Sequence, residues 1–341
     1  MDAEILSLIR KQCRGKQHIK LTVGFISNGS TTIGVFNENG ETDYKDYLYE
    51  IGSITKTFTA SLLAKYLHEG KISLDDSIAT YVRGLEQNRY YPTIKRLITH
   101  TSGYAQRLPM SRTTLLKSVI AGITNERFAS MLYMDEQKMK AILNKVKLSD
   151  KDYKWQYSNF GVALVGYALG VISGKGYTAA MDEFLAKELG LPNSYTGTYP
   201  GKNLPGFRKN ETVGGNVVYG DSLLRPCGDI SSTAKDLLRY AEINFNEELP
   251  YLSVCHQKYT KHGFLYTRLL DVDMGLGWWI GKNEKILLHG GDTAVFSSVL
   301  IADKKHKTAT VVLSNYPGNS YNLSKIAIPL LKKINGQGAV K

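Results

Sequence analysis

The sequence has few of the residues that build disulfide frameworks and metal centres. Its 341 residues include only three cysteines, Cys13, Cys227 and Cys255, too few and too scattered for a set of disulfides or a CxxC metal site. The seven histidines show no HxH or HExxH spacing, so we expect no metal and no cofactor. We therefore expect any chemistry to depend on the chain's own side chains.

Long apolar runs are also missing. The longest near-apolar stretch, Gly161 to Gly174, covers about 14 residues and contains four glycines, whereas a membrane-spanning helix needs roughly 20 apolar residues. The first twenty residues include two acidic residues and no apolar core of a signal peptide. We expect no membrane span, and a cytoplasmic location for the chain as written or an extracytoplasmic one if a leader or anchor precedes it.

Acidic residues are outnumbered by basic ones, 31 against 43, and the formal net charge is +12. A nucleic-acid-binding protein would need Lys and Arg clustered on one face with interleaved aromatic residues. Here the densest basic runs, Lys138–Lys154 and Lys304–Lys307, contain no such motif. We expect a solvated basic surface that attracts anionic substrates or an anionic envelope, and no nucleic-acid partner.

Strand-like segments lie near both ends of the chain. After a short amphipathic helix, Lys20–Ser27 and Thr31–Phe36 flank the turn Ser27–Ser30 and predict a hairpin, and Asp46–Ile51 predicts a third strand. Toward the end, strands are predicted at Leu276–Ile280, Lys285–Leu288, Ser297–Ala302 and Thr308–Ser314, followed by a helix at Leu323–Ile334.

The middle of the chain is helical in character. Ser53–His68 contains no breaker, is apolar on more than one face and stops at Gly70, which predicts a helix buried inside the protein. Helical periodicity recurs at 112–122, 125–147, 159–173, 178–189 and about 231–245. We predict an α+β fold in which an antiparallel sheet is flanked by terminal helices. Residues 1–52 and 205–341 would form the sheet domain, and 53–204 an inserted, mainly helical domain with the Ser53 helix at the seam.

The segment Ser53-Ile54-Thr55-Lys56 opens the buried helix. Residues three apart share a helix face, so the Lys56 ammonium can reach the Ser53 hydroxyl. A serine is a weak nucleophile until a base takes its proton, and a lysine serves when burial and nearby cations lower its pKa. The start of the helix also places backbone N–H groups beside the serine, as one half of an oxyanion hole. The alternative is an ordinary N-cap serine.

The same SxxK spacing recurs at Ser232-Thr233-Ala234-Lys235, so the motif alone is weak. This second copy opens an amphipathic helix, and we interpret it as an N-cap serine followed by an exposed lysine. The buried character of the first helix separates the two copies, because burying Lys56 without a purpose is costly.

Two further motifs carry polar groups suited to catalysis. In Tyr157-Ser158-Asn159, the tyrosine can act as general base or acid near cations, and the Asn159 amide can hold a substrate amide. The alternative there is a helix N-cap with a packed tyrosine.

In His289-Gly290-Gly291-Asp292, the glycines let a substrate lie against a strand edge, and His289 could polarise a substrate carboxylate or tune Tyr157. The alternative is a turn with a surface histidine.

In this order, the three motifs resemble those of the serine β-lactamase and penicillin-binding protein superfamily, specifically its class C β-lactamase-like branch. The resemblance runs from about residue 20 to about residue 330 and implies a β-lactamase/transpeptidase-like fold. Four longer segments also resemble segments of members of this superfamily, namely Tyr49–Lys56, Leu97–Gly103, Pro226–Thr233 and Gly275–Trp278.

The resemblance implies a role for each site residue. Ser53 would be the acyl-forming nucleophile, Lys56 its proton acceptor or the tuner of Tyr157, and Tyr157 the base and the acid that protonates the leaving group. The substrate-binding residues would be Asn159, His289, Gly291 and Asp292, with the backbone N–H groups of Ser53 and Asp292 forming the oxyanion hole. His100 is expected to make structural hydrogen bonds, and Cys227 to be a packed small residue.

One departure bears on the substrate. His289 stands where many members carry the Lys of Lys-Thr-Gly, which makes the carboxylate-binding position a conditional cation. This weakens the case for a dedicated β-lactamase and fits the esterase, D-aminopeptidase and peptidase-like members. Residues 105–155, with Met110, Met131, Met134 and Met139, are interpreted as a substrate-shaping cap, with a core face as the alternative.

The predicted function is that of a serine hydrolase. It would act through a Ser53 acyl-enzyme on the amide, ester or β-lactam carbonyl of a small molecule or short peptide, including D-amino-acid peptides. Two alternatives stay open. An acyltransferase would use the same acyl-enzyme with a hydroxyl or amine in place of water, and a non-catalytic penicillin-binding sensor would be acylated without turnover.

Overall fold

The computed structural model of the chain describes residues 1–104, 133–197, 204–208, 210–213, 220–261, 271–281, 285–317 and 320–336. Its strands are β1 (Leu21–Ser27), β2 (Ser30–Asn37), β3 (Gly40–Thr42), β4 (Tyr49–Glu50), β5 (Tyr195–Thr196), β6 (Gly206–Arg208), β7 (Glu211–Val213), β8 (Ile230–Ser232), β9 (Thr260–Lys261), β10 (Val272–Met274), β11 (Trp279–Gly281), β12 (Ile286–Asp292), β13 (Ser297–Asp303) and β14 (Thr308–Ser314). Its helices are α1 (Ala3–Cys13), α2 (Thr55–His68), α3 (Ile94–Ile98), α6 (Glu136–Lys145), α7 (Asn159–Ser173), α8 (Gly176–Glu183), α9 (Ala234–Asn246) and α10 (Ser320–Ile334).

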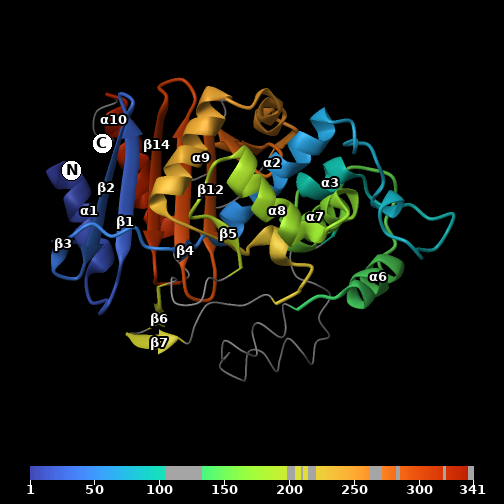
Figure 1. Cartoon of the computed structure of the whole chain (residues 1–341), viewed down its shortest axis with the longest axis horizontal. Helices are drawn as coiled ribbons and strands as arrows, with labels where there is room; N and C mark the ends of the chain where they lie inside the picture. The colour runs from blue at the N-terminus through green and yellow to red at the C-terminus, as the bar shows by residue number, and fades with distance from the viewer. Residues whose placement is uncertain are drawn as a thin grey trace.

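The two ends of the chain build one nine-stranded antiparallel sheet (Figure 1). Its strand order is β3-β2-β1-β14-β13-β12-β11-β10-β9, so the ends meet where β1 pairs with β14 and Leu21 lies opposite Ser314. The predicted hairpin joins β1 to β2 through Asn28 and Gly29, whose φ angles of 51° and 71° suit a tight hairpin turn. The α+β fold with its antiparallel sheet is therefore confirmed.

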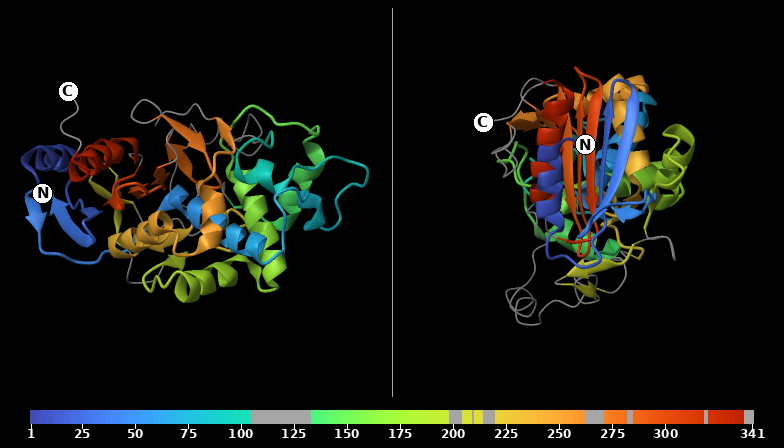
Figure 2. Two further views of the ribbon diagram at one scale, coloured as in Figure 1. Left: turned by 90° about the horizontal axis from the view of Figure 1, so that it is seen from above. Right: turned by 90° about the vertical axis from the view of Figure 1, so that its left-hand side faces the viewer.

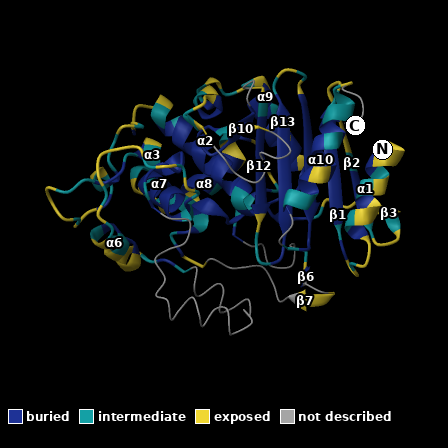
Figure 3. Ribbon diagram, turned by 180° about the vertical axis from the view of Figure 1, so that it is seen from behind, coloured by how far each residue is buried: buried dark blue, intermediate teal, exposed yellow. Residues whose placement is uncertain are grey.

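Helices cover both faces of this sheet (Figure 2). On one face, α10 packs on β13 and β14 and carries α1 beside it, while α9 lies on the opposite face against the same central strands. Because both faces are covered, every residue of β13 and β14 is buried, and Figure 3 shows this as a continuous dark band. This explains why the two strands appear in the sequence as nearly unbroken apolar runs.

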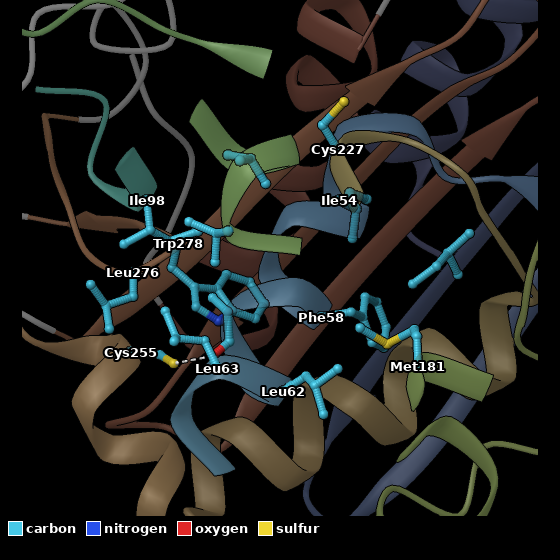
Figure 4. Packing of buried hydrophobic residues seen from close by; sticks show 14 of the residues in the cluster. Ile54, Phe58, Leu62, Leu63, Ile98, Met181, Cys227, Cys255, Leu276 and Trp278 are labelled. Atoms are coloured by element: carbon cyan, nitrogen blue, oxygen red, sulfur yellow. Dashed lines mark hydrogen bonds between the residues drawn. The ribbon is translucent and has the colours of Figure 1, made fainter. Parts of the chain in front are cut away.

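Helix α2 lies in the interior, between α9, α7 and the sheet side that carries β12. Eleven of its fourteen residues are buried, as its apolar character on several faces predicts. The Phe58 ring stacks on Tyr240 of α9 with 3.8 Å between ring centroids. Trp278 and Leu276 also pack near this helix (Figure 4). The Cys255 thiol donates to the Ala60 carbonyl oxygen at 3.4 Å. The start of α2 is thereby fixed relative to the sheet.

Several predicted boundaries are corrected. The strand expected at Asp46–Ile51 shrinks to β4, which belongs to a separate three-stranded sheet with β8 and β5. The strand expected at Leu276–Ile280 is interrupted, because Gly277 adopts a φ of 68° and its Cβ position would lie 2.5 Å from the Lys56 carbonyl oxygen. The chain therefore turns between β10 and β11.

The helical middle of the chain is borne out in part. Helix α7 matches its prediction and α8 starts two residues early, whereas the helix predicted at 112–122 and the first part of 125–147 lie outside the described residues. Met134 and Met139 are buried in the main core, which supports the core interpretation for them, while Met110 and Met131 lie outside the described residues. The division into a sheet domain (1–52, 205–341) and a helical insertion (53–204) stays a prediction.

No single helix in the described ranges is long and apolar enough to cross a membrane. The pair formed by α7 and Gly176–Glu188 passes that test only when taken together, by length and composition, and it bends by 80° at its break. Among the same residues, no group of three or more His, Cys, Asp or Glu side chains could hold a metal ion.

We expect Phe58→Ala to lower the free energy of unfolding by about 3–5 kcal/mol, because it leaves a cavity between α2 and α9. Chemical denaturation measures this. The matched control is Val171→Ala on α7, a side chain that is 48% exposed, for which a change within about 0.5 kcal/mol is expected. Equal losses in the two variants would contradict the central place of α2.

Candidate active site

Ser53 lies in a 3₁₀ turn, Gly52–Ile54, that leads from β4 into α2. Gly52 has a φ of 51°, and a Cβ there would lie 2.9 Å from the backbone nitrogen of Asp292. The turn needs a glycine for both reasons, since the left-handed conformation and the close approach each exclude a side chain. Ser53 is thereby held between the start of a buried helix and the end of β12.

Lys56 is fully buried and points at the predicted nucleophile. Its Nζ donates a hydrogen bond to Ser53 Oγ at 3.0 Å and another to the Cys227 carbonyl oxygen at 2.6 Å. None of the ion pairs among the described residues includes Lys56. The two hydrogen bonds orient its amine.

Tyr157 completes a three-residue cluster around one oxygen atom. Its hydroxyl donates to Ser53 Oγ at 2.8 Å, and its ring centroid lies 4.9 Å from Lys56 Nζ. Three residues from two places in the chain, Ser53 and Lys56 from one and Tyr157 from the other, thus meet as the sequence motifs predict. The Ser53 hydroxyl has two proton-transferring groups within hydrogen-bond distance.

His100 positions Tyr157. It lies in the loop after α3 with a φ of 63°, and its ring centroid is 4.7 Å from that of Tyr157. Its carbonyl accepts from the Gln156 backbone at 2.9 Å, and its Nδ1 accepts from the Ser158 backbone at 3.2 Å. The structural hydrogen bonds expected of His100 are confirmed, and they clamp the residues on both sides of Tyr157.

Asn159 is the first residue of α7, directly after the Ser158 side chain that caps this helix through the Gly161 backbone at 3.0 Å. Its side-chain Oδ1 is buried and accepts no hydrogen bond from the described residues. A buried acceptor without a protein partner is the group that a substrate N–H would satisfy. The substrate-binding role of Asn159 stays a prediction, with which this buried oxygen is compatible.

Gly291 brings strand β12 against the Ser53 turn. A Cβ at this position would lie 2.0 Å from the Ile51 carbonyl oxygen and 2.9 Å from the Ser53 nitrogen. The Ser298 hydroxyl on β13 ties the same carbonyl down at 2.8 Å. Only a glycine permits this contact, so its place in the motif has a steric reason.

Asp292 follows on β12, and its side chain turns toward α10. Its carboxylate accepts hydrogen bonds from the backbone nitrogen of Ser320, at 2.9 Å, and from the Ser320 hydroxyl. A carboxylate at a helix N-terminus is favourable because it meets unpaired N–H groups. The sequence identified Asp292 for its backbone N–H, and this capping contact was missed because Ser320 is distant in the chain.

His289 requires a correction. It is only 1% exposed, and it stacks on Trp279 with 4.7 Å between ring centroids, so the alternative of a surface histidine in a turn is wrong. Burial, reinforced by the Lys56 ammonium, lowers the pKa of His289 to about 3. The imidazole is therefore neutral near pH 7, and the conditional cation expected at this position is confined to acidic conditions.

Cys227 contributes through its backbone. The thiol is buried, which raises its pKa, and it packs as expected with a contact to the Leu224 carbonyl at 2.7 Å. Its carbonyl oxygen accepts the hydrogen bond from Lys56 Nζ. The Arg225–Asp229 ion pair, at 2.5 Å, stabilises the turn that contains Cys227. Residue-type patterns could not reveal this acceptor, because any amino acid supplies a carbonyl oxygen.

The second SxxK copy contains no such cluster. Ser232 closes β8 and contacts the Ser194 hydroxyl at 2.8 Å, and Lys235 is exposed. The N-cap of α9 is Thr233 rather than Ser232, a shift of one residue from the prediction. The two copies thus differ in burial, as expected.

Comparison with known proteins agrees with the geometry. The family model described as Beta-lactamase matches residues 31–328. The chain belongs to the Beta-lactamase family. Curated proteins similar to the chain include a beta-lactamase of Providencia stuartii, 26% identical over 71% of this chain, and the protein flp of Staphylococcus aureus strain MW2, 21% identical over 78% of it. The chain spans only 59% and 52% of the lengths of these two relatives.

Several solved structures share the fold of this chain. The octameric penicillin-binding protein homologue from Pyrococcus abyssi has a TM-score of 0.77 at 20% identity, over 99% of this chain and 78% of that one. A class C beta lactamase from Rhodobacter sphaeroides has a TM-score of 0.76 at 17% identity, over 98% and 99%. These likenesses establish the β-lactamase/transpeptidase-like fold predicted from the sequence motifs.

We expect Lys56→Met to lower the rate of ester cleavage without lowering the thermal stability of the protein. Replacing a buried amine by an apolar chain of similar length leaves the thermal midpoint unchanged or raises it. The rate of ester cleavage should fall by about 10²–10⁴, because the contact to Ser53 Oγ is lost. Lys235→Met, in the second SxxK copy, is the control and should leave the rate unchanged. A rate unaffected by Lys56→Met would exclude Lys56 from the reaction.

Proposed function

We propose that the protein is a serine hydrolase that acts through an acyl-enzyme on Ser53. The observation that carries this proposal is the convergence of the Lys56 amine and the Tyr157 hydroxyl on one serine oxygen, at 3.0 and 2.8 Å. Membership of the Beta-lactamase family supports it. The reaction class is cleavage of an ester, amide or β-lactam carbonyl in a small molecule or short peptide.

Acylation follows from the positions of these groups. The Lys56–Tyr157 pair takes the proton of the Ser53 hydroxyl as Oγ adds to the substrate carbonyl carbon. The negative charge that forms on the carbonyl oxygen would be stabilised by the backbone N–H groups of Ser53 and Asp292. Collapse of the tetrahedral intermediate breaks the bond to the leaving group, which receives its proton from Tyr157.

Deacylation repeats these steps with water as the nucleophile. Tyr157 takes a proton from the water as its oxygen adds to the acyl carbon, and Ser53 Oγ leaves with a proton returned by the Lys56–Tyr157 pair. The products are a carboxylic acid and the free enzyme. An acyltransferase would use an alcohol or amine at this step, and a sensor would not complete it.

Intact-mass spectrometry with p-nitrophenyl acetate and with a penicillin tests the proposal. We expect an adduct in the wild type that is absent in Ser53→Ala, and release of p-nitrophenol with turnover. The matched control is Ser232→Ala, which alters the serine of the second SxxK copy and should keep the adduct. An adduct that forms in Ser53→Ala would refute the proposal, and one that persists without turnover would favour the sensor.

Tyr157→Phe should lower kcat for the same ester by about 10²–10⁴, since a positioned general base contributes about that factor. The phenyl ring keeps the packing against His100, so the thermal midpoint should change little. Stopped-flow measurement of the first turnover shows whether acylation or deacylation is slowed. An unchanged kcat would remove Tyr157 from the mechanism and leave Lys56 as the base.

A further inference from the structure

A second polar side chain of α2 binds the turn that contains Cys227. We propose that Thr59 is a positioning residue for the reaction, oriented in turn by the Tyr177 hydroxyl of α8. By binding the Pro226 carbonyl oxygen, Thr59 fixes the direction of the next carbonyl, which accepts the hydrogen bond from Lys56 Nζ. This inference rests on the proposed acyl-enzyme, and it adds two residues that the three sequence motifs do not contain.

Two consecutive carbonyl groups of the turn accept hydrogen bonds from α2. The Pro226 carbonyl oxygen accepts from Thr59 Oγ1 at 2.7 Å, and the Cys227 carbonyl oxygen accepts from Lys56 Nζ at 2.6 Å. Lys56 and Thr59 are three residues apart and therefore lie on the same face of the helix. Because the two carbonyls belong to neighbouring planar peptide groups, a rotation of the first changes the direction of the second. Thr59 thus acts on the acceptor that orients the Lys56 amine.

The hydrogen bonds run in one direction, from α8 to the turn. A carbonyl oxygen can only accept, so the single hydroxyl proton of Thr59 is used by Pro226. The Tyr177 hydroxyl lies 2.7 Å from the same Oγ1 and therefore donates to it. Thr59 Oγ1 also lies 3.3 Å from the Thr55 carbonyl oxygen, a competing acceptor in its own helix. By donating to one lone pair of Oγ1, Tyr177 keeps the threonine proton directed at Pro226.

These hydroxyl groups are buried and closely packed. Thr59 is fully buried, and burial raises the pKa of Tyr177 well above its usual range, so the phenol keeps its proton. Helix α7 permits the approach at two glycines. A Cβ at Gly166 would lie 2.0 Å from Pro226 Cγ, and one at Gly170 would lie 2.7 Å from the Tyr177 nitrogen. The proline ring and α8 therefore rest directly on α7, which limits the movement of the turn.

Helix α2 carries a second hydroxyl pair that differs in one respect. Ser61 Oγ lies 2.8 Å from the Tyr240 hydroxyl of α9 and donates to the Thr57 carbonyl oxygen at 3.0 Å. Both pairs are buried and join α2 to a neighbouring helix through a tyrosine. The Ser61 pair ends on a carbonyl of α2 itself, whereas the Thr59 pair ends on the turn. A purely structural role would be common to both pairs, and a positioning role belongs to the Thr59 pair alone.

Single-turnover release of p-nitrophenol from p-nitrophenyl acetate, with enzyme in excess, tests the inference. Each variant is measured well below its own thermal midpoint, so that only folded protein reacts. We expect Thr59→Val to lower the maximal acylation rate constant about tenfold or more, since a small misplacement of a catalytic group costs up to about 100-fold. The enzyme concentration that gives half the maximal rate should stay unchanged. Thr59→Ser keeps the hydroxyl and should restore the rate constant.

The Ser61 pair provides the controls. Ser61→Ala should leave the rate constant unchanged even where it lowers the thermal midpoint, and Tyr240→Phe should do the same. Tyr177→Phe should lower the rate constant about threefold, since the Thr59 proton is then shared with Thr55.

A wild-type rate constant in Thr59→Val, or equal losses in Thr59→Val and Ser61→Ala, overturns the inference. If Thr59→Val does not fold, the comparison of Tyr177→Phe with Tyr240→Phe decides, and equal rate constants in these two variants overturn it. The absence of both p-nitrophenol release and a Ser53 adduct in the wild type would instead overturn the proposed function.

Discussion

The close contact between strand β12 and the Ser53 turn is the constraint on which the site depends. At Gly291 the two backbones approach so closely that no side chain fits between them, and Ser298 fixes the turn from the next strand. This contact sets the position of the serine relative to the sheet. Everything else in the site is then placed by elements that pack on α2 or on β12.

The burial of Lys56 is the second constraint. The surrounding helices and the turn at Cys227 remove water from an amine that makes two hydrogen bonds to the described residues. Such burial opposes folding unless packing elsewhere compensates for it. The rings of Phe58, Tyr240 and Trp278 supply that packing around α2. The aromatic packing of the core therefore offsets the cost of burying Lys56.

The sequence predicted those features that depend on residue type and short spacing. Apolar patterns predicted α7, the hairpin at Asn28 and the buried strands, and the motifs predicted the Ser53, Lys56 and Tyr157 cluster. It could not predict contacts made by backbone atoms or by distant partners, such as the Cys227 carbonyl and the Ser320 cap. The burial of His289 was not predicted either, because it arises only when distant parts of the chain, such as Trp279 of β11, pack around it.

The pairing of β1 with β14 has a consequence for how the protein folds. The centre of the sheet joins residues almost three hundred positions apart, as the bond from the Lys20 backbone to the Asn315 side chain illustrates. Contacts this distant in sequence slow folding, because a long loop must close before they form. During synthesis, the edge of β1 that pairs with β14 therefore stays unpaired until β14 has been made. The Ser53 turn is made early, but strand β12, which packs against it at Gly291, is made more than two hundred residues later.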